Sequence, residues 1–356
     1  MNSEHIKTLF RAEVLALSAY KVTDARGFIK LDAMENPFSW PEDIKQQWLK
    51  SLTDCALNRY PDPEARQLCL TLRQNNGIAD EHGLILGNGS DEIIQMLLMA
   101  LPTGSGVLAP DPSFVMYKQV SLSLGLDYIG VPLNSETFDL DLDAMLDAIA
   151  LHQPSLVFLA YPNNPTGNLF KKEAVIEIIK ACKGLVVLDE AYAPFANASF
   201  MGELSHFDNL LVMRTLSKLG LAGLRLGYLA GHPDIIQELN KIRLPYNINI
   251  LTQATAEFAL QHNELFDTQT AILCSERSRV LSSLEAMSRF CVYPSAANFI
   301  LFRTQPDQAT TLFEHIKKQG VLIKNMSPQG GLMKDCLRVT IGKPEENDAF
   351  LKALSA

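Results

Sequence analysis

From about residue 84, short apolar stretches alternate along the chain with longer amphipathic segments. The short stretches are rich in Val, Ile and Leu, whereas apolar residues in the longer segments recur at helical spacing. Short apolar runs are typical of buried strands, and the second pattern is typical of helices that pack through one face. The first pairs are a strand at 83–88 with a helix at 90–101, a strand at 106–110 with a helix at 116–125, and a strand at 126–133 with a helix at 141–152.

The same order continues in the middle of the chain. It predicts a strand at 155–162 with a helix at 171–184, strands at 184–192, 209–217 and 225–231, and a helix at 233–242. Such alternation predicts an α/β fold with a mostly parallel central sheet that is flanked by helices. The stretches at 155–162, 184–192 and 209–217 are apolar without alternation, so we expect them to be central strands buried on both faces.

The pattern changes in the last hundred residues. A helical stretch at about 250–289 is followed by strands at 291–304, 321–326 and 336–342, with helices near 307–319 and 344–355. This mixture predicts a smaller α+β domain at the C-terminus. Residues 1–60 contain prolines, aromatics and few regular periods. We therefore predict an N-terminal arm with part of the small domain at 1–60, a large α/β domain at 61–250 and a small C-terminal domain at 251–356.

Composition narrows the classes of function. The 356 residues carry a formal net charge of −9, which disfavours binding to nucleic acid or to an anionic membrane because phosphate-rich surfaces attract excess Lys and Arg. A small-molecule substrate is therefore expected. No apolar run approaches the roughly 18 residues of a membrane span, and the N-terminus lacks an apolar signal segment. We expect a cytoplasmic protein. The six cysteines show no CxxC or metal-type spacing, so we expect reduced thiols and no metal site.

Polar motifs follow four of the predicted strands. They are "GNGSDE" at 87–92, "YPNNPTG" at 161–167, "LDEAY" at 188–192 and "RTLSK" at 214–218. In open α/β sheets, ligands bind outside the carboxyl ends of the strands. These four motifs are therefore expected to converge on one site.

The first motif is a candidate anion site. Gly89 precedes Ser90 and Asp91, which begin a helix whose free backbone amides suit a phosphate group. Ser and Asp are also ordinary helix N-caps, so a purely structural role is the alternative. The third glycine of a GxGxxG fingerprint is missing and no GxxxxGK[ST] loop occurs, so a nucleotide cofactor is disfavoured.

Two further motifs offer partners for a ring. Asp189 ends a buried strand, where a carboxylate needs a cation or a donor to offset its desolvation. A protonated ring nitrogen would be a suitable partner. Tyr192 and the turn residue Asn164 are able to bind a neighbouring ring oxygen through a phenol and an amide. The alternative is that Asp189 only caps the following turn.

Lys218 stands among leucines and glycines in "TLSKLGLAGLRLG". A lysine that is neutral at pH 7 needs a pKa shift of about 3 units, which desolvation, nearby cations or a Schiff base provide. The alternative is a surface lysine with its ammonium in water. The hydroxyls of Thr215 and Ser217 and the guanidinium of Arg225 would complete a phosphate site beside it.

At these residues the sequence resembles the pyridoxal-phosphate-dependent aminotransferases of the aspartate-aminotransferase fold, the fold type I transferases. Among the class II members it is most similar to histidinol-phosphate aminotransferases. The resemblance covers nearly the whole chain and rests on eight motifs in order: "NRYPD" at 58–62, "GNGSDEII" at 87–94, "PDPSFVMY" at 110–117, "YPNNPTG" at 161–167, "VVLDEAY" at 186–192, "RTLSK" at 214–218, "GLAGLRLGY" at 220–228 and "CLRVTIG" at 336–342.

The resemblance implies a reaction and a cofactor. The reaction is the reversible transamination of L-histidinol phosphate with 2-oxoglutarate to imidazole-acetol phosphate and L-glutamate, in histidine biosynthesis. The cofactor is pyridoxal 5'-phosphate. Lys218 is then expected to form a Schiff base with it and to carry a proton, and Asp189 to keep the pyridine nitrogen protonated. Asn164 and Tyr192 would bind the ring oxygen.

The resemblance also implies the remaining site residues. Phe114 would stack on the ring; the alternative is that it only begins the next helix. Tyr60 would reach the cofactor phosphate of a second subunit, which implies a homodimer with shared active sites. Arg338 would hold the anionic group of the substrate. The phosphate would be bound by Gly89, Ser90, Asp91, Thr215, Ser217 and Arg225, and the substrate entrance lined by Tyr20 and Asn36.

Two departures and several alternatives remain. The link from Lys218 to Arg225 is one residue shorter than the commoner "SKxFxLAGLR" form, and Met34 stands where the family often has asparagine. Transamination of aromatic amino acids and decarboxylation of phosphothreonine, on the same fold, would use the same cofactor motifs. A non-catalytic sensor of this fold would need a fused DNA-binding module. A NAD-dependent dehydrogenase is disfavoured by the missing glycine.

Overall fold

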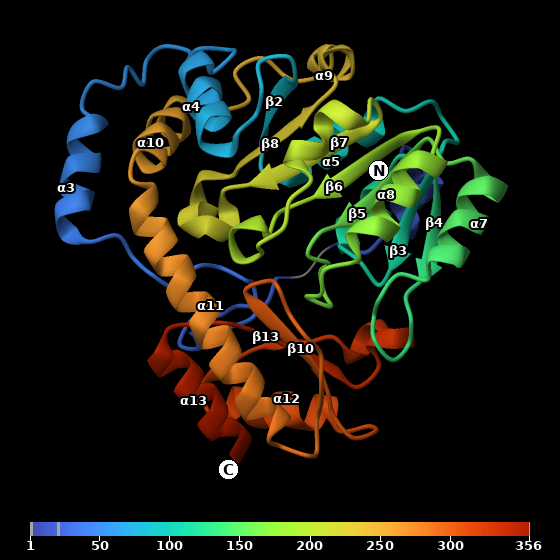
Figure 1. The fold of residues 1–356 in the computed structure, drawn as a ribbon, viewed down its shortest axis with the longest axis vertical. Helices are drawn as coiled ribbons and strands as arrows, with labels where there is room; N and C mark the ends of the chain where they lie inside the picture. Colours follow the sequence, from blue (N-terminus) through green and yellow to red (C-terminus); the bar gives the residue numbers. More distant parts are fainter. Residues whose placement is uncertain (1–2, 20–21, 356) are drawn as a thin grey trace.

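The computed structural model describes residues 3–19 and 22–355, which form a large sheet with its helices and a smaller part below it (Figure 1). Within this part of the chain the large sheet has seven strands in the order β2-β8-β7-β6-β5-β3-β4. The strands are β2 (Gly83–Asn88), β3 (Gly106–Asp111), β4 (Asp127–Pro132), β5 (Leu156–Ala160), β6 (Leu185–Asp189), β7 (Leu210–Thr215) and β8 (Leu226–Gly231).

The large sheet is mostly parallel, as the sequence predicts. Strands β4, β3, β5, β6 and β7 pair in parallel, whereas β8 pairs antiparallel with both β7 and β2. The three stretches without alternation become β5, β6 and β7 in the middle of the sheet, and their side chains are almost all buried. The prediction of central strands is therefore confirmed.

Helices cover both faces of this sheet (Figure 1). One face packs against α4 (Arg66–Asn76), α7 (Leu142–His152), α8 (Lys172–Ala181) and α10 (Ile250–Leu260). The other packs against α5 (Ser90–Met99), α6 (Val115–Ser123) and α9 (Pro233–Asn240). Successive strand residues serve opposite cores: Val157 packs toward the first set of helices and Phe158 toward the second.

The C-terminal part is built around an antiparallel sheet. Within the described chain this sheet has four strands, in the order β12-β13-β10-β9. They are β9 (Cys291–Val292), β10 (Phe299–Arg303), β12 (Lys324–Asn325) and β13 (Cys336–Thr340). The long helix α11 (Asn263–Glu285), with α12 (Ala309–Lys318) and α13 (Pro344–Ser355), packs against it around an apolar cluster.

The N-terminal residues contain more regular structure than the sequence predicts. They form α1 (Ser3–Lys7), α2 (Ala12–Ala16), α3 (Glu42–Ser51) and β1 (Ile29–Lys30), which pairs in parallel with β11 (Val321–Leu322). The N-terminal residues therefore pair with the C-terminal part, and the strands of the large sheet follow them in the sequence. The domain boundaries at 60 and 250 stay predictions. Short 3₁₀ or π turns lie at Ala193–Phe195, Met201–His206, Ser217–Leu221, Ala222–Leu224, Ser327–Gln329 and Gly331–Met333.

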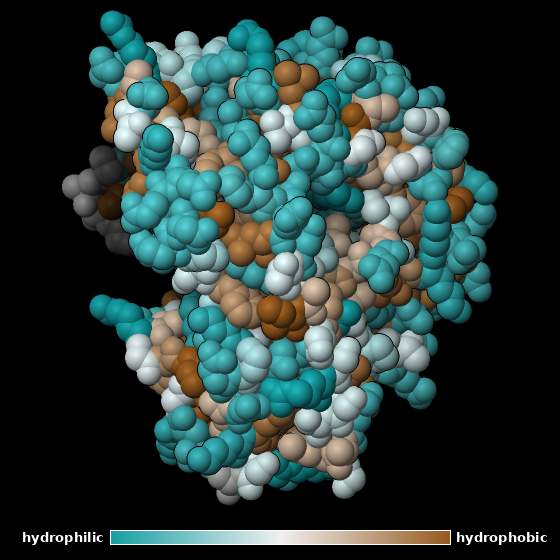
Figure 2. Space-filling model, turned by 60° about the vertical axis from the view of Figure 1, so that its left-hand side comes forward, coloured by the Kyte–Doolittle hydropathy of each residue, from teal (hydrophilic) through white to brown (hydrophobic). Residues whose placement is uncertain are grey.

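On the face drawn in Figure 2, hydrophilic residues predominate and hydrophobic residues gather in patches, several of them across the middle. In residues 3–19 and 22–355, no helix combines the length and the apolar character that a membrane crossing requires.

Candidate active site

A cavity opens at the carboxyl ends of β5, β6 and β7, whose last residues Ala160, Asp189 and Thr215 all line it. The first turn of α5 closes one side. The structure brings ten of the predicted site residues to this cavity: Ser90, Asp91, Phe114, Asn164, Asp189, Tyr192, Thr215, Ser217, Lys218 and Arg225. All four strand-end motifs contribute, because parallel strands deliver their carboxyl ends to one edge of the sheet.

Asp189 is a buried carboxylate whose hydrogen-bond donors among the described residues are neutral. Its Oδ2 accepts a hydrogen bond of 2.6 Å from the Tyr117 hydroxyl, and its Oδ1 accepts one of 3.1 Å from the amide of Ala191. Burial raises the pKa of Asp189 to about 6, although these two bonds work in the opposite direction. None of the ion pairs among the described residues includes Asp189. The carboxylate thus remains available to a cationic ligand.

Tyr117 is a site residue that the sequence analysis did not identify. Its ring stacks on Phe158 with 4.3 Å between centroids, and it is fully buried. Burial, followed by the charge of Asp189, raises the pKa of Tyr117 well above its ordinary value, so the phenol stays protonated and donates to the carboxylate. Its place three residues after Phe114, about one turn along α6, was the available signal.

Lys218 lies in the tight turn that follows β7. Its Nζ donates a hydrogen bond of 3.2 Å to the carbonyl of Ala33 and lies 5.8 Å from the ring centre of Tyr192. Burial, together with the nearby charge of Arg338, lowers the pKa of Lys218 to about 8. The amine is therefore partly neutral near physiological pH.

The side of the cavity nearest α5 offers hydrogen-bond donors for an anion. The Thr215 and Ser217 hydroxyls lie 2.9 Å apart, and Nη2 of Arg225 donates to Asp91 across 2.9 Å. Gly227 allows β8 to pass closely under the start of α5, because a Cβ there would lie 2.6 Å from the Ser90 amide nitrogen. These donors lie beside the free amides of the first helical turn.

The shortened link between Lys218 and Arg225 takes a tight path. Gly220 adopts φ +129° and Arg225 itself adopts a left-handed φ of 51°. Arg225 nevertheless lines the cavity. Gly89 gives it room, since a Cβ at residue 89 would lie 2.5 Å from Nη2 of Arg225.

A polar chain connects the cavity to the small sheet. Nη1 of Arg338, in β13, donates a hydrogen bond of 2.6 Å to Oδ1 of Asn164. The amide of Asn164 in turn donates to the Tyr192 hydroxyl across 3.1 Å. Nη2 of Arg338 reaches the carbonyl of Asp32 at 3.2 Å, and its guanidinium lies 5.2 Å from the ring centre of Phe299. Arg338 is thus buried beside the cavity with its orientation fixed.

The predicted entrance residue Asn36 is not among the described residues that line the cavity. The Asn36 amide donates to the Leu219 carbonyl and to Oε1 of Gln269, both at 3.0 Å, so it joins the turn after Lys218 to α11. Tyr20 lies outside the described residues.

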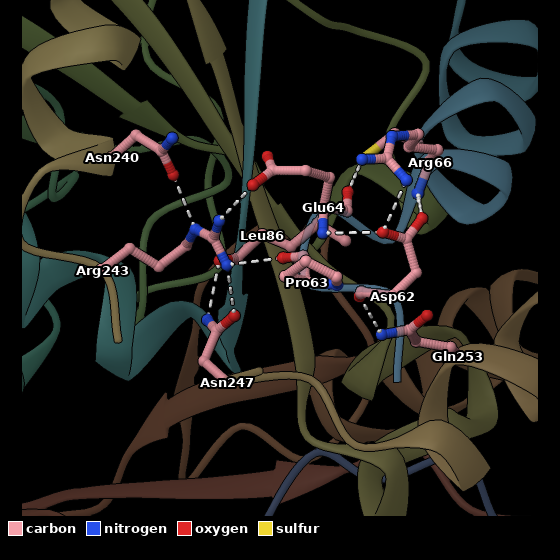
Figure 3. A network of polar contacts seen from close by, with 10 residues as sticks. Asp62, Pro63, Glu64, Arg66, Leu86, Asn240, Arg243, Asn247 and Gln253 are labelled. Carbon is pink, nitrogen blue, oxygen red and sulfur yellow. Dashed lines mark hydrogen bonds and ion pairs between the residues drawn. The ribbon is translucent and has the colours of Figure 1, made fainter. Parts of the chain in front are cut away.

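Tyr60 lies on the surface, with 79% of it exposed, and its ring stacks on Tyr246 with 4.4 Å between centroids. The chain next to Tyr60 is held by a polar network that Figure 3 shows from close by. Arg243, after α9, is its centre. The groups bound to Arg243 are the Asn240 and Asn247 side chains, the Pro63 carbonyl and the Glu64 carboxylate, and Gln253 donates to the Asp62 carbonyl. Tyr60 is therefore displayed from a fixed segment.

The arrangement has a definite chemical capacity. The cavity combines donors for an anion, a carboxylate that is in none of the ion pairs among the described residues, and a partly neutral amine. Among residues 3–19 and 22–355, no group of three or more His, Cys, Asp or Glu side chains is arranged to hold a metal ion.

Comparison with known proteins agrees with this arrangement. The family model "Aminotransferase class I and II" matches residues 26–354. The chain is 55% identical to histidinol-phosphate aminotransferase 2 of Nitrosococcus oceani, over 100% of this chain and 99% of that relative. It is 49% identical to the histidinol-phosphate aminotransferase of Chromobacterium violaceum, over 98% of each chain.

Among solved structures, the histidinol-phosphate aminotransferase of Sinorhizobium meliloti in complex with pyridoxal-5'-phosphate superposes with a TM-score of 0.86. It is 24% identical and covers 97% of this chain and 96% of that one. At this identity the likeness shows the fold, which is that of the fold type I aminotransferases. The match over most of the chain and the identities near 50% show the family as well. The chain belongs to the aminotransferase class I and II family.

Proposed function

We propose that this protein is a pyridoxal-5'-phosphate-dependent aminotransferase that interconverts L-histidinol phosphate and 2-oxoglutarate with imidazole-acetol phosphate and L-glutamate, in histidine biosynthesis. The observation that carries the proposal is the partly neutral amine of Lys218 in one cavity with the uncompensated carboxylate of Asp189. Relatives named histidinol-phosphate aminotransferase, about half identical over the whole chain, support the substrate.

The residues of the cavity fit the cofactor. A protonated pyridine nitrogen would give Asp189 the cation that it lacks among residues 3–19 and 22–355, and the Asn164 and Tyr192 pair would bind the ring oxygen. The amides that begin α5, with Ser217 and Arg225, would bind the phosphate. When bound, the cofactor supplies an aldehyde for an amine and a ring that takes up electrons from the substrate carbon.

Lys218 and Arg338 would divide the work on the substrate. The lysine amine is neutral often enough to act as a nucleophile and to move a proton at the carbon that bears the substrate nitrogen. The planar guanidinium of Arg338 is fixed by Asn164 and Asp32 and would bind a carboxylate or a phosphate ester equally well. One arginine would then serve both amino donors.

The proposal includes a homodimer in which Tyr60 reaches the cofactor phosphate of the second subunit. Tyr60 is 79% exposed, and Leu57 and Leu244 expose 71% and 69%. Tyr60 stacks on Tyr246, two residues after Leu244, and a contiguous exposed apolar patch is typical of a surface that binds another protein. A solution mass of two chains is the expected result. We also propose a cytoplasmic location, which the six unpaired cysteines support.

Half-reaction rates test the substrate. The purified, cofactor-loaded protein is mixed separately with L-histidinol phosphate, L-phenylalanine and L-threonine phosphate, and the loss of its yellow colour is followed. L-histidinol phosphate should react fastest. A tenfold or greater preference for phenylalanine would instead identify an aromatic-amino-acid transaminase, and release of carbon dioxide from phosphothreonine would identify a decarboxylase.

Lys218→Ala tests the catalytic residue. The variant should still bind the cofactor but lose about 10²- to 10⁴-fold in turnover, the usual contribution of a positioned acid–base group. Lys183→Ala, at an exposed position, is the matched control and should retain its activity. An active Lys218→Ala variant would refute the mechanism.

A further inference from the structure

The segment 31–36 crosses from the small sheet to the reactive lysine. Its first residue, Leu31, pairs with Leu322 and Thr340 in the C-terminal part, and its last, Asn36, is bound to the carbonyl of Leu219. Among the described residues that line the cavity, Met34 is the one contributed by this segment. The segment therefore covers the cavity and presents one apolar side chain to it.

The carbonyls of this segment are held by the groups of the site. Nη2 of Arg338 donates to Asp32 and Nζ of Lys218 donates to Ala33, both at 3.2 Å. Asn298 donates to the carbonyl of Met34 at 3.0 Å. A molecule that extends from the lysine amine to the arginine must pass next to residues 32–34. Met34 thus lines the cavity on the segment that binds both the lysine and the arginine.

The backbone of Met34 is in a conformation that methionine rarely adopts. Its φ is 53°, in the left-handed region, and its amide donates to the Thr340 hydroxyl at 3.0 Å while its carbonyl is bound by Asn298. Such strain persists where surrounding contacts fix the backbone, and it concentrates at functional sites. Asparagine or glycine would adopt the same backbone more easily. The backbone conformation therefore does not account for a methionine at this position.

We propose that Met34 is a specificity-determining residue, which forms the apolar wall against which the ring of the amino donor packs. Only 8% of it is exposed, and it lies in one apolar cluster with Ala191, Tyr192 and Phe299. An unbranched thioether adapts its shape and makes favourable contacts with aromatic rings. The Met34 side chain would therefore favour a substrate that carries an unsaturated ring. It would still leave room for the unbranched side chain of glutamate. This inference rests on the proposed function and identifies a determinant of its selectivity.

The experiment compares Met34→Asn, Met34→Ala and Met34→Leu. Both half-reactions, cofactor affinity and the unfolding midpoint of the cofactor-free protein are measured. Met34→Asn relieves the backbone but buries an amide in the apolar cluster, so its unfolding midpoint should be no lower than that of Met34→Ala, and its cofactor affinity should match the wild type. Its KM for L-histidinol phosphate should rise about tenfold, as expected for lost apolar contact in a pocket, while its KM for L-glutamate changes less than about threefold. Met34→Leu, which keeps the volume, should stay near the wild type.

Each other outcome overturns the inference in a recognisable way. Equal losses with both amino donors, or weaker cofactor binding in Met34→Asn, would assign Met34 a purely structural role. Unchanged kinetics in Met34→Ala would place it away from the substrate. A wild-type protein that reacts with neither donor would refute the proposed function itself, and the inference with it.

Discussion

Asp189 and Glu190 are adjacent buried acids at the end of β6, and they face opposite sides of the large sheet. Asp189 faces the cavity and accepts hydrogen bonds from Tyr117 and Ala191, both neutral. Glu190 is fully buried on the other face, where its Oε2 accepts from Nε and Nη2 of Arg214 at 2.9 and 2.8 Å. The Ser199 hydroxyl, at 2.8 Å, and the Phe200 amide bind the same carboxylate.

The two carboxylates differ in what compensates their burial. Glu190 has its cation within the chain, so it ties β6 to β7 and to the loop at 199–200. Asp189 has none among the described ion pairs, and burial raises its pKa to about 6. Burial alone therefore does not distinguish a structural acid from a ligand-binding one. The absence of a paired cation distinguishes them, because it leaves a desolvation cost that a cationic ligand can offset.

Glu190→Ala should produce the largest effect on stability. It leaves the guanidinium of Arg214 buried without a counter-charge, and breaking a buried pair in this way costs about 3–5 kcal/mol. The free energy of unfolding of the cofactor-free protein, measured with urea at pH 7, should fall by that amount. Glu238→Ala is the control: it breaks the exposed pair with Lys241 and should cost about 1 kcal/mol or less. Equal costs for the two variants would contradict the comparison.

Asp189→Asn should instead raise the free energy of unfolding of the cofactor-free protein at neutral pH. Between its ordinary pKa of 3.8 and about 6, the folded protein holds a proton at this site that the unfolded chain has lost. Stability therefore falls as pH rises through this interval, and the penalty is complete above pH 6. A shift of about two pKa units corresponds to up to about 3 kcal/mol, which the neutral amide of the variant would recover in the cofactor-free protein.

Urea unfolding between pH 5 and pH 8 measures this gain, which should grow from pH 5 to pH 6 and then level off. Asp208→Asn, at an exposed position, should show no such dependence. Cofactor affinity should fall in Asp189→Asn, because the ring nitrogen loses its counter-charge. A variant that is less stable than the wild type at pH 8 would show that the carboxylate is structural, like Glu190.

Much of the fold follows from local pattern. Continuous apolar runs identify β5, β6 and β7 because strands buried on both faces need no polar alternation. The reversed direction of β8 was not predicted, although the link at 216–225 is too short for the crossover that a parallel neighbour requires. The regular structure of residues 1–60 was also missed, since β1 is defined by its pairing with β11, almost three hundred residues away in sequence.

The sequence predicts those residues of the candidate site that directly follow a strand and have polar or charged side chains. Asp189 and Lys218 were identified because a buried acid and a lysine among leucines are costly without a partner. Contacts between distant segments were not predictable in this way. The bonds of Arg338 to Asn164 and of Lys218 to Ala33 join residues 174 and 185 positions apart, and both depend on how the small sheet meets the large one.

Tyr117→Phe should change the free energy of unfolding least among the three variants. It tests directly what sets the pKa of Asp189. It removes one neutral donor from Asp189 but keeps the ring that stacks on Phe158. The free energy of unfolding should fall by about 1.5–3 kcal/mol at pH 7, the range for one hydrogen bond to a charged group. Because the Tyr117 bond lowers the pKa of Asp189, its loss should move that pKa above 6.

The pKa change separates this explanation from a simple packing defect. The pH interval in which Asp189→Asn stabilises the protein is measured in the wild-type and Tyr117→Phe backgrounds, and it should lie higher in the second. Tyr128→Phe removes a phenol from β4 at the edge of the same sheet and should leave the interval unchanged. If both tyrosine variants lose stability but leave this pH interval unchanged, the phenol of Tyr117 does not lower the pKa of Asp189. The contrast between Asp189 and Glu190 would then rest on Arg214 alone.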